Sequence, residues 1–202
     1  MTKAQLELLI KKSGVSPSIA HAFEKVDRAD FVPPQSKGEA YEDRPIPLHE
    51  GQTTSQPSLI AFILEKLRLE KGHRVLEVGT GFGFQTALLS ELVGKKGFVV
   101  SIEFFGRIYE EAFSRLKGRK NVLLVQGDGK NGFAEKAPFD AIVVSAACAS
   151  TPKTLFSQLK EGGRMVFPLQ KALFAQDLVL VEKKKGKALE TVLLPVAFVP
   201  LR

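Results

Sequence analysis

The sequence has very little cysteine, the residue that forms disulfides and cysteine-based metal sites. Its single cysteine, Cys148, excludes an internal disulfide and a metal site built from several cysteines. No apolar run approaches the ~18 residues that a membrane-spanning helix needs. Residues 1–14, MTKAQLELLIKKSG, carry charges around a short apolar stretch without a small-residue cleavage site, which predicts an amphipathic helix and not a signal peptide. We therefore expect a cytoplasmic protein without a metal site or a membrane partner.

The net charge of +7 could indicate nucleic-acid binding. The basic residues, however, fall in short groups at 11–12, 95–96, 117–120 and 183–187. Each group lies where a helix is expected to end or a hairpin to turn, and cations near helix C-termini are stabilised by the helix dipole. We interpret these groups as solvated ends of helices and strands, and expect no nucleic-acid partner.

The N-terminal part of the chain is expected to be helical and then irregular. A second short helix is predicted with Ser16 at its N-cap and Pro17 in its first turn. Residues 31–57 hold five prolines and little periodicity, which predicts extended coil; such a long segment inside a compact domain is often functional. A helix over residues 55–69 follows, with Ser55 near its cap.

From residue 74 onward, strands and helices alternate. Strands are predicted at 74–78, 97–103, 121–126, 140–146 and 162–169, and helices at 84–93, 107–116 and 152–160. This order predicts a Rossmann-like, doubly wound α/β fold with a mostly parallel sheet. Residues 175–199 form two strands around a turn at Gly186, which predicts a C-terminal antiparallel hairpin. We expect one domain over 1–202, with N-terminal helices and coil over 1–56 and an α/β core over 57–202.

The stretch VLEVGTGFGFQTA, residues 75–87, reads as a strand, a glycine-rich turn and the start of a helix. In an open α/β sheet such a turn lies where ligands bind. Dinucleotide-binding turns have the pattern G-x-G-x-x-G, in which helix amides receive a pyrophosphate. Here Gly79, Gly81 and Gly83 alternate as G-x-G-x-G, which disfavours an NAD-dependent enzyme. EVGTGFG instead resembles the first motif of the S-adenosylmethionine-dependent methyltransferases.

Two further positions support a cofactor site at this sheet edge. Glu103 ends the second strand of the core, about 20 residues beyond the glycine turn, where a carboxylate can accept hydrogen bonds from ribose hydroxyls. GDG, residues 127–129, follows the third strand, so Asp128 can lie beside an adenine and the backbone of Gly129 can approach it. A glutamate at a strand end or a GDG sequence, taken alone, more often only reflects the residues that turns prefer. Together with the glycine turn, and in the order of the strands, they favour a cofactor site.

Longer motifs carry a specific resemblance. The chain is similar to the protein-L-isoaspartate O-methyltransferase family from about residue 22 to residue 201, through FVPP, AYEDRPIPLHEGQTTSQP, VLEVGTGFGFQTALLSELVG, GDGKNGFAEKAPFDAIVVSAA, QLKEGGRMVFP and FVPLR. The resemblance implies a repair enzyme that uses S-adenosyl-L-methionine to methylate the free α-carboxylate of L-isoaspartyl residues, after which the ester closes to a succinimide. The implied partners are isoaspartyl-containing peptides and proteins, and a monomer is expected.

The implied reaction suits a sequence without a visible catalytic triad. An α-carboxylate has a pKa near ~3.5, so it is ionised and nucleophilic at pH 7. The methyl group of a sulfonium is already activated. Transfer therefore needs positioning and exclusion of water more than a general base.

The resemblance also implies site residues. Ser55, in GQTTSQP, matches the family's active-site serine, although a serine there could also only cap the next helix. The cofactor residues expected from the resemblance and the patterns above are Gln52, Thr53, Thr54, Glu77, Gly79, Thr80, Gly81, Gly83, Glu103, Asp128, Gly129 and Gln176. Asp43 matches a position that recurs in the family. Two interpretations stay open for it, a residue of a surface turn and a residue on the substrate side of the site. His49 and Cys148 are interpreted as a loop residue and a packing residue.

Four positions depart from the family pattern. Phe82 stands where a small residue is usual, Thr54 replaces isoleucine, Ala149 replaces a common proline, and Gln170 replaces glycine. Phe82 could point away from the cofactor or crowd its methionine carboxylate. These departures keep two alternatives open, a methyltransferase acting on RNA or another small carboxylate, and a degenerate non-catalytic member.

Overall fold

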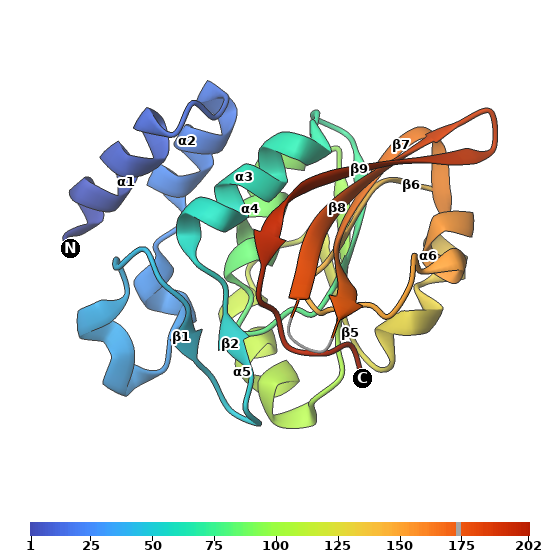
Figure 1. The fold of residues 1–202 in the computed structure, drawn as a ribbon. Helices are drawn as coiled ribbons and strands as arrows, with labels where there is room; N and C mark the ends of the chain where they lie inside the picture. The colour runs from blue at the N-terminus through green and yellow to red at the C-terminus, as the bar shows by residue number, and fades with distance from the viewer. Residues whose placement is uncertain (173–174) are drawn as a thin grey trace.

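The computed structural model describes residues 1–172 and 175–202, with a seven-stranded sheet at the centre (Figure 1). The strand order is β5-β4-β3-β6-β7-β8-β9. The strands are β3 (Arg74–Val78), β4 (Phe98–Glu103), β5 (Val122–Gln126), β6 (Phe139–Val144), β7 (Leu159–Ala172), β8 (Ala175–Lys184) and β9 (Lys187–Val196). The pairs from β5 to β7 are parallel, and β8 and β9 add antiparallel strands. The expected mostly parallel sheet with a C-terminal hairpin is confirmed, and its strand order reverses between β3 and β6, where ligands bind.

The two faces of the sheet are covered unequally. One face packs its alternate residues, such as Val75 and Val99, against the helices of the N-terminal half. These helices are α1 (Lys3–Lys12), α2 (Pro17–Lys25), α3 (Pro57–Leu67), α4 (Phe84–Val93) and α5 (Gly106–Leu116). The other face packs Leu76 and Val100 against α6 (Lys153–Ser157) and the 3-10 turns η3 (Gly129–Asn131) and η4 (Ala134–Lys136). Both faces are therefore covered, as a doubly wound fold requires.

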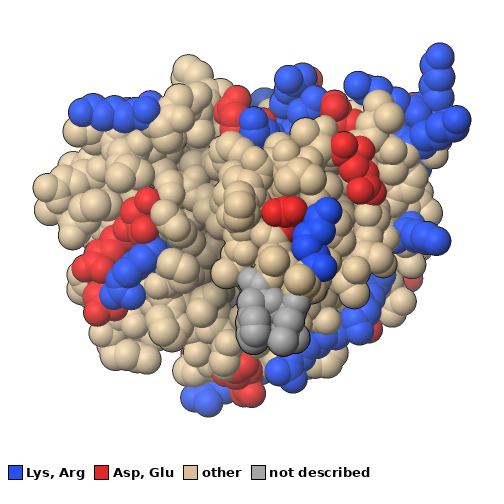
Figure 2. Space-filling model, in the orientation of Figure 1, with Lys and Arg blue, Asp and Glu red and all other residues tan. Residues whose placement is uncertain are grey.

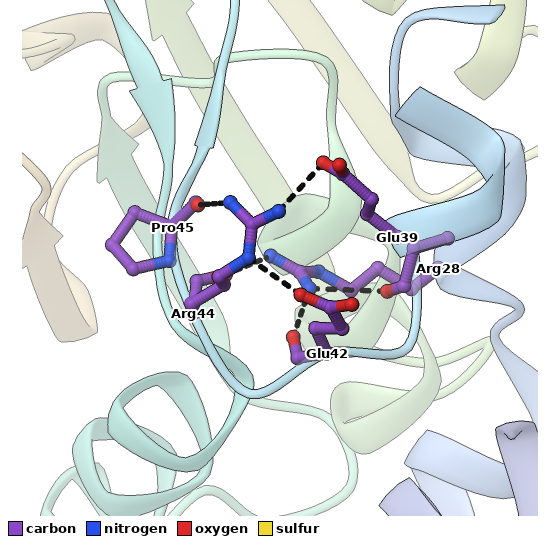
Figure 3. A network of polar contacts seen from close by, with 6 residues as sticks. Arg28, Glu39, Glu42, Arg44 and Pro45 are labelled. Carbon is purple, nitrogen blue, oxygen red and sulfur yellow. Dashed lines mark hydrogen bonds and ion pairs between the residues drawn. The ribbon is translucent and has the colours of Figure 1, made fainter. Parts of the chain in front are cut away.

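The prediction of extended coil over residues 31–57 is wrong. The segment contains the end of η1 (Arg28–Phe31), the 3-10 helix η2 (Pro34–Glu39) and a small antiparallel pair, β1 (Ile46–Pro47) with β2 (Thr53–Thr54). The organising residue is Arg28, whose side chain is buried. Its guanidinium donates to four backbone carbonyl oxygens at 2.8–3.1 Å, those of Ala40, Glu42, Arg44 and Ser55. Figure 3 shows Arg28 together with Glu42 and Arg44 of this segment. The segment is thus held by one long-range side chain that hydrophobic periodicity does not reveal.

Two boundaries near β7 also differ from the expectation. The helix expected over 152–160 ends at Ser157, and β7 begins at Leu159 instead of residue 162. Pairing of Leu159 with Phe139 of β6 draws these residues into the sheet, with an irregularity before the ladder resumes at Ala141 and Arg164. The strand therefore gains residues that local pattern assigns to the helix.

The basic groups lie at the ends of helices and strands, as expected. Lys11 and Lys12 are in the last turn of α1, and Lys117 is the C-cap of α5. Figure 2 shows basic and acidic side chains mixed over the face in view, with a basic cluster at the upper right, over the turn between β8 and β9. None of the helices in the two described ranges is long and apolar enough to cross a membrane.

Candidate functional site

A cavity lies at the carboxyl ends of β3, β4 and β6, where the topology places a ligand site. It encloses about 880 Å³ of empty space when the open solvent at its mouth is included. Its wall combines the glycine loop at 78–82, the end of β4 at 102–105, residues 52–55 around β2, residues 145–146 after β6, and the C-terminal residues 199–202. Of the expected cofactor residues, those in the wall are Gln52, Thr53, Thr54, Gly79, Thr80, Gly81, Glu103 and Gly129.

The glycine loop has the backbone conformation that requires glycine. Gly79, Gly81 and Gly83 have φ of 93°, 57° and 94°, in the left-handed region that side chains rarely adopt. Gly79 and Gly81 line the cavity. Gly83 does not: it begins α4, and a Cβ there would lie 2.8 Å from Cδ1 of Leu116. The third glycine therefore permits close packing of α5 on the start of α4, not approach to a ligand.

Glu103 joins the loop to the cavity. Its carboxylate, 5% exposed, accepts hydrogen bonds from the backbone N–H of Gly81 at 2.9 Å and of Phe105 at 3.1 Å, one on each oxygen. Burial raises the pKa of this carboxyl, and the backbone N–H groups of Phe105, Gly81, Phe104 and Thr80 oppose the shift. A carboxylate only accepts hydrogen bonds, so Glu103 is an acceptor at the cavity wall for hydroxyl groups of a ligand.

Glu77 lies beneath the cavity and not in its wall. It is fully buried, and accepts hydrogen bonds from Gln85 Nε2 at 2.9 Å, from Ser101 Oγ at 2.6 Å and from the Thr86 hydroxyl. Burial raises its pKa to about 7, against these donors. Glu77 therefore joins β3, β4 and α4 through these hydrogen bonds and positions Gln85, a residue of the cavity wall.

Asp128 and Gln176 also lie outside the cavity wall. Asp128 is exposed and its carboxylate accepts from the backbone N–H of Lys130 at 2.9 Å. Gln176 exchanges two hydrogen bonds with the backbone of Phe198, at 2.7 and 3.0 Å, and donates to Gln170 Oε1 at 3.1 Å. It therefore holds the start of the C-terminal segment that lines the cavity.

Phe82 is buried at the cavity wall with only 2% of its surface exposed. Its ring centroid lies 4.5 Å from the Arg115 guanidinium carbon and 5.6 Å from the His49 ring. The phenylalanine is thus accommodated by packing against α5 and the loop before β2, and the cavity remains open beside it. Of the other departures, Thr54 lines the cavity, whereas Ala149 and Gln170 lie outside its wall.

A second cavity opens beside the first, between the start of α3 and residues 194–199. Four residues, Thr53, Ser55, Ser145 and Val199, line both cavities and form what we call the junction. The sequence patterns pointed to Thr53 and Ser55 here but not to Ser145 or Val199, since an isolated serine and an apolar residue carry no chemical signal. The FVPLR motif marked the last segment without showing that it lines the site.

Ser55 is not a helix cap. The N-cap of α3 is Gln56, and the first turn is held by Asp43, whose carboxylate accepts from Ser58 N at 2.8 Å and from Gln56 Nε2 at 2.9 Å. The backbone oxygen of Ser55 is tied to Arg28, while its hydroxyl makes no hydrogen bond to any residue in the described ranges. The Ser55 hydroxyl is therefore available at the junction, and Asp43 is a capping residue beside the second cavity.

The described residues hold no group of three or more His, Cys, Asp or Glu side chains placed to bind a metal ion. Cys148 is buried, and burial raises the pKa of its thiol to about 11. It packs in the core on the α6 side of the sheet, as expected.

Comparison with known proteins agrees with these observations. The model of the family described as "Protein-L-isoaspartate(D-aspartate) O-methyltransferase (PCMT)" matches residues 1–202. Protein-L-isoaspartate O-methyltransferase 2 of Syntrophobacter fumaroxidans is 45% identical over 195 residues, which cover 95% of this chain and 78% of that protein. The enzyme named protein-L-isoaspartate O-methyltransferase in Methanothermobacter thermautotrophicus is 41% identical over 189 residues, 92% of this chain and 87% of that protein.

Solved structures show the same fold. One titled protein-L-isoaspartate O-methyltransferase superposes with a TM-score of 0.91 at 38% identity and covers 98% of this chain; the match spans 65% of that longer chain. A Plasmodium falciparum structure titled as a complex with S-adenosyl-L-homocysteine has a TM-score of 0.87 at 24% identity, covering 98% of this chain and 97% of that one. The last likeness shows the fold alone. Through the family match over its whole length and relatives above 40% identity, the chain belongs to the protein-L-isoaspartate(D-aspartate) O-methyltransferase family.

Proposed function

We propose that this chain transfers a methyl group from S-adenosyl-L-methionine to the free α-carboxylate of L-isoaspartyl residues, with Ser55 orienting that carboxylate. Family membership makes the chain an S-adenosylmethionine-dependent protein carboxyl O-methyltransferase. The observation that carries the residue roles is the junction, where the two cavities share Thr53, Ser55, Ser145 and Val199. A methyl donor in one cavity and an acceptor in the other can meet only there, and in-line transfer needs the reacting atoms within about 3–3.5 Å.

The residues of the first cavity fit the cofactor. Gly79 and Gly81 offer backbone without side chains, and the carboxylate of Glu103 in the cavity wall is an acceptor for ribose hydroxyls. Ile102 and Phe104 provide apolar surface beside Glu103 for a base. When bound, the cofactor supplies an electrophilic methyl group on a sulfonium.

The second cavity suits an anionic nucleophile. Its described lining contains hydroxyl, amide and apolar side chains, and no lysine or arginine. A carboxylate there receives neutral hydrogen-bond donors and no ion pair, so its charge stays available for attack on the methyl carbon. The hydroxyl of Ser55 donates to one carboxylate oxygen and holds the plane of the group, while the walls exclude water. No proton needs to be removed, because the carboxylate is already ionised at neutral pH.

The same lining weighs against an RNA acceptor. RNA binding is dominated by cationic contacts to phosphates, and the described residues of this cavity offer none. The open first cavity beside Phe82 weighs against a degenerate member. A cytoplasmic monomer without nucleic-acid or membrane partners remains our prediction.

The direct test is methyl transfer from labelled S-adenosyl-L-methionine to two synthetic peptides that differ only in L-isoaspartate against L-aspartate. We expect base-labile methylation of the isoaspartyl peptide alone. Equal transfer to both peptides, or to neither while the cofactor binds by calorimetry, would refute the proposed acceptor. Loss of cofactor binding would identify a degenerate protein.

A further inference from the structure

Ser145 occupies a rigid position at the junction. It follows β6, and its backbone N–H donates to the Val78 carbonyl at 2.8 Å, which continues the pairing of β6 with β3. Its side chain lies against Gly79, where an added Cβ would come within 3.3 Å of the Ser145 Cβ. Gly79 thus makes room for the Ser145 side chain, which lines both cavities from the side of the sheet.

The hydrogen bonds around Ser145 determine which way its proton points. Gln85 Nε2 lies 2.9 Å from Glu77 Oε1 and 3.1 Å from Ser145 Oγ. In the structure the NH₂ end of Gln85 faces Glu77 Oε1, to which it donates, and its second hydrogen is directed to Ser145 Oγ. The serine oxygen accepts from Gln85, which leaves its own proton for another acceptor. No residue in the described ranges accepts that proton.

We propose that Ser145 donates this proton in a hydrogen bond to the acceptor carboxylate, as a second hydroxyl beside Ser55; this inference rests on the proposed function. One donor fixes one carboxylate oxygen but leaves the group free to turn about that contact. Donors from two elements, residue 55 before α3 and residue 145 after β6, define the orientation of the carboxylate. Gln85 and Glu77 act through Ser145 as positioning residues, held in turn by Ser101 and Thr86.

The test is Ser145→Ala, compared with Ser145→Thr, which keeps the hydroxyl, and with Ser114→Ala, an exposed serine on α5 outside both cavities. Loss of a hydrogen bond to a charged group predicts a fall of roughly tenfold or more in kcat/KM for the isoaspartyl peptide. Most of this fall in kcat/KM should come from a higher KM for the peptide. The calorimetric Kd for S-adenosyl-L-methionine should stay within twofold of the wild-type value. Ser145→Thr and Ser114→Ala should stay within about threefold of wild type in kcat/KM, since both leave a donor at the junction.

Three results would overturn the inference. The first is an unchanged kcat/KM in Ser145→Ala. The second is a weakening of cofactor binding in Ser145→Ala as large as its fall in kcat/KM, which would assign Ser145 to the cofactor. The third is a fall in kcat/KM in Ser145→Thr as large as that in Ser145→Ala. If the alanine variant does not fold, Ser145→Cys provides a side chain of similar size with a weak donor, and the same loss is expected. Wild-type protein is assayed first, so a failure of the proposed function appears as absent transfer in wild type, whereas a failure of this inference leaves wild-type transfer intact.

Discussion

Replacing Arg28 by methionine tests whether one buried guanidinium organises the segment that carries Ser55. Arg28 is 2% exposed and donates to four carbonyl oxygens between residues 40 and 55. Burial lowers the pKa of its guanidinium to about 10, so Arg28 remains charged at neutral pH. Methionine keeps much of the side-chain length but removes every donor.

The loss of stability expected for Arg28→Met follows from the number of hydrogen bonds that the substitution removes. At about 1 kcal/mol net for each, the four bonds contribute about 4 kcal/mol to the free energy of unfolding. For a domain of this size about 2–4 °C of Tm corresponds to each kcal/mol, so Tm should fall by roughly 8–16 °C. The variant should also raise the KM for the isoaspartyl peptide, because the carbonyl of Ser55 loses its donor.

Arg44 provides the matched control, since it belongs to the same network but is exposed. Its guanidinium pairs with Glu39 at 2.7 Å and with Glu42 at 2.6 Å. Exposed ion pairs contribute little to stability, so Arg44→Met should unfold close to the wild-type Tm. Thermal unfolding by circular dichroism decides the matter: equal Tm values for the two variants would refute the role assigned to Arg28.

Three further predictions concern the site. Ser55→Ala should lower kcat/KM for the isoaspartyl peptide roughly tenfold to a hundredfold with cofactor Kd unchanged; unaltered kinetics would remove Ser55 from the mechanism. The pKa of Glu77 is raised to about 7, so its contribution to stability is full below its unfolded pKa of ~4.3 and is lost as pH rises through 7. Glu77→Gln should flatten the decline of Tm between pH 5 and 8, and an identical slope in both proteins would contradict this. Gly83→Ala should lower Tm, because its φ is 94° and the new Cβ would meet Leu116, whereas Gly118→Ala has open space and should not; a similar Tm for both would count against the packing role.

The local sequence pattern was sufficient to predict many of the strands and helices of the α/β core. The strand at 74–78 and the helix at 84–93 have the predicted boundaries, because both are mostly apolar segments bounded by turn residues. The alternating order of strands and helices predicted a mostly parallel sheet around the glycine loop. The motif around Ser55 indicated the acceptor side before any contact was known.

Only the tertiary structure decided where individual side chains point and what holds the irregular segment. Glu77 is paired in register with Ser101, which lies two residues before Glu103 and on the same face of the sheet. The two glutamates therefore differ in their position along the strands: Glu77 lies under the loop, whereas Glu103, the last residue of β4, reaches the cavity wall. Arg28 acts on carbonyls 12 to 27 residues away, and Ser145 meets Ser55 at the junction only because β6 packs beside β3. Periodicity and propensity describe neighbours in the chain, so the sequence alone determined the fold and the family, whereas long-range contacts that only the folded chain makes determined the residues that complete the site.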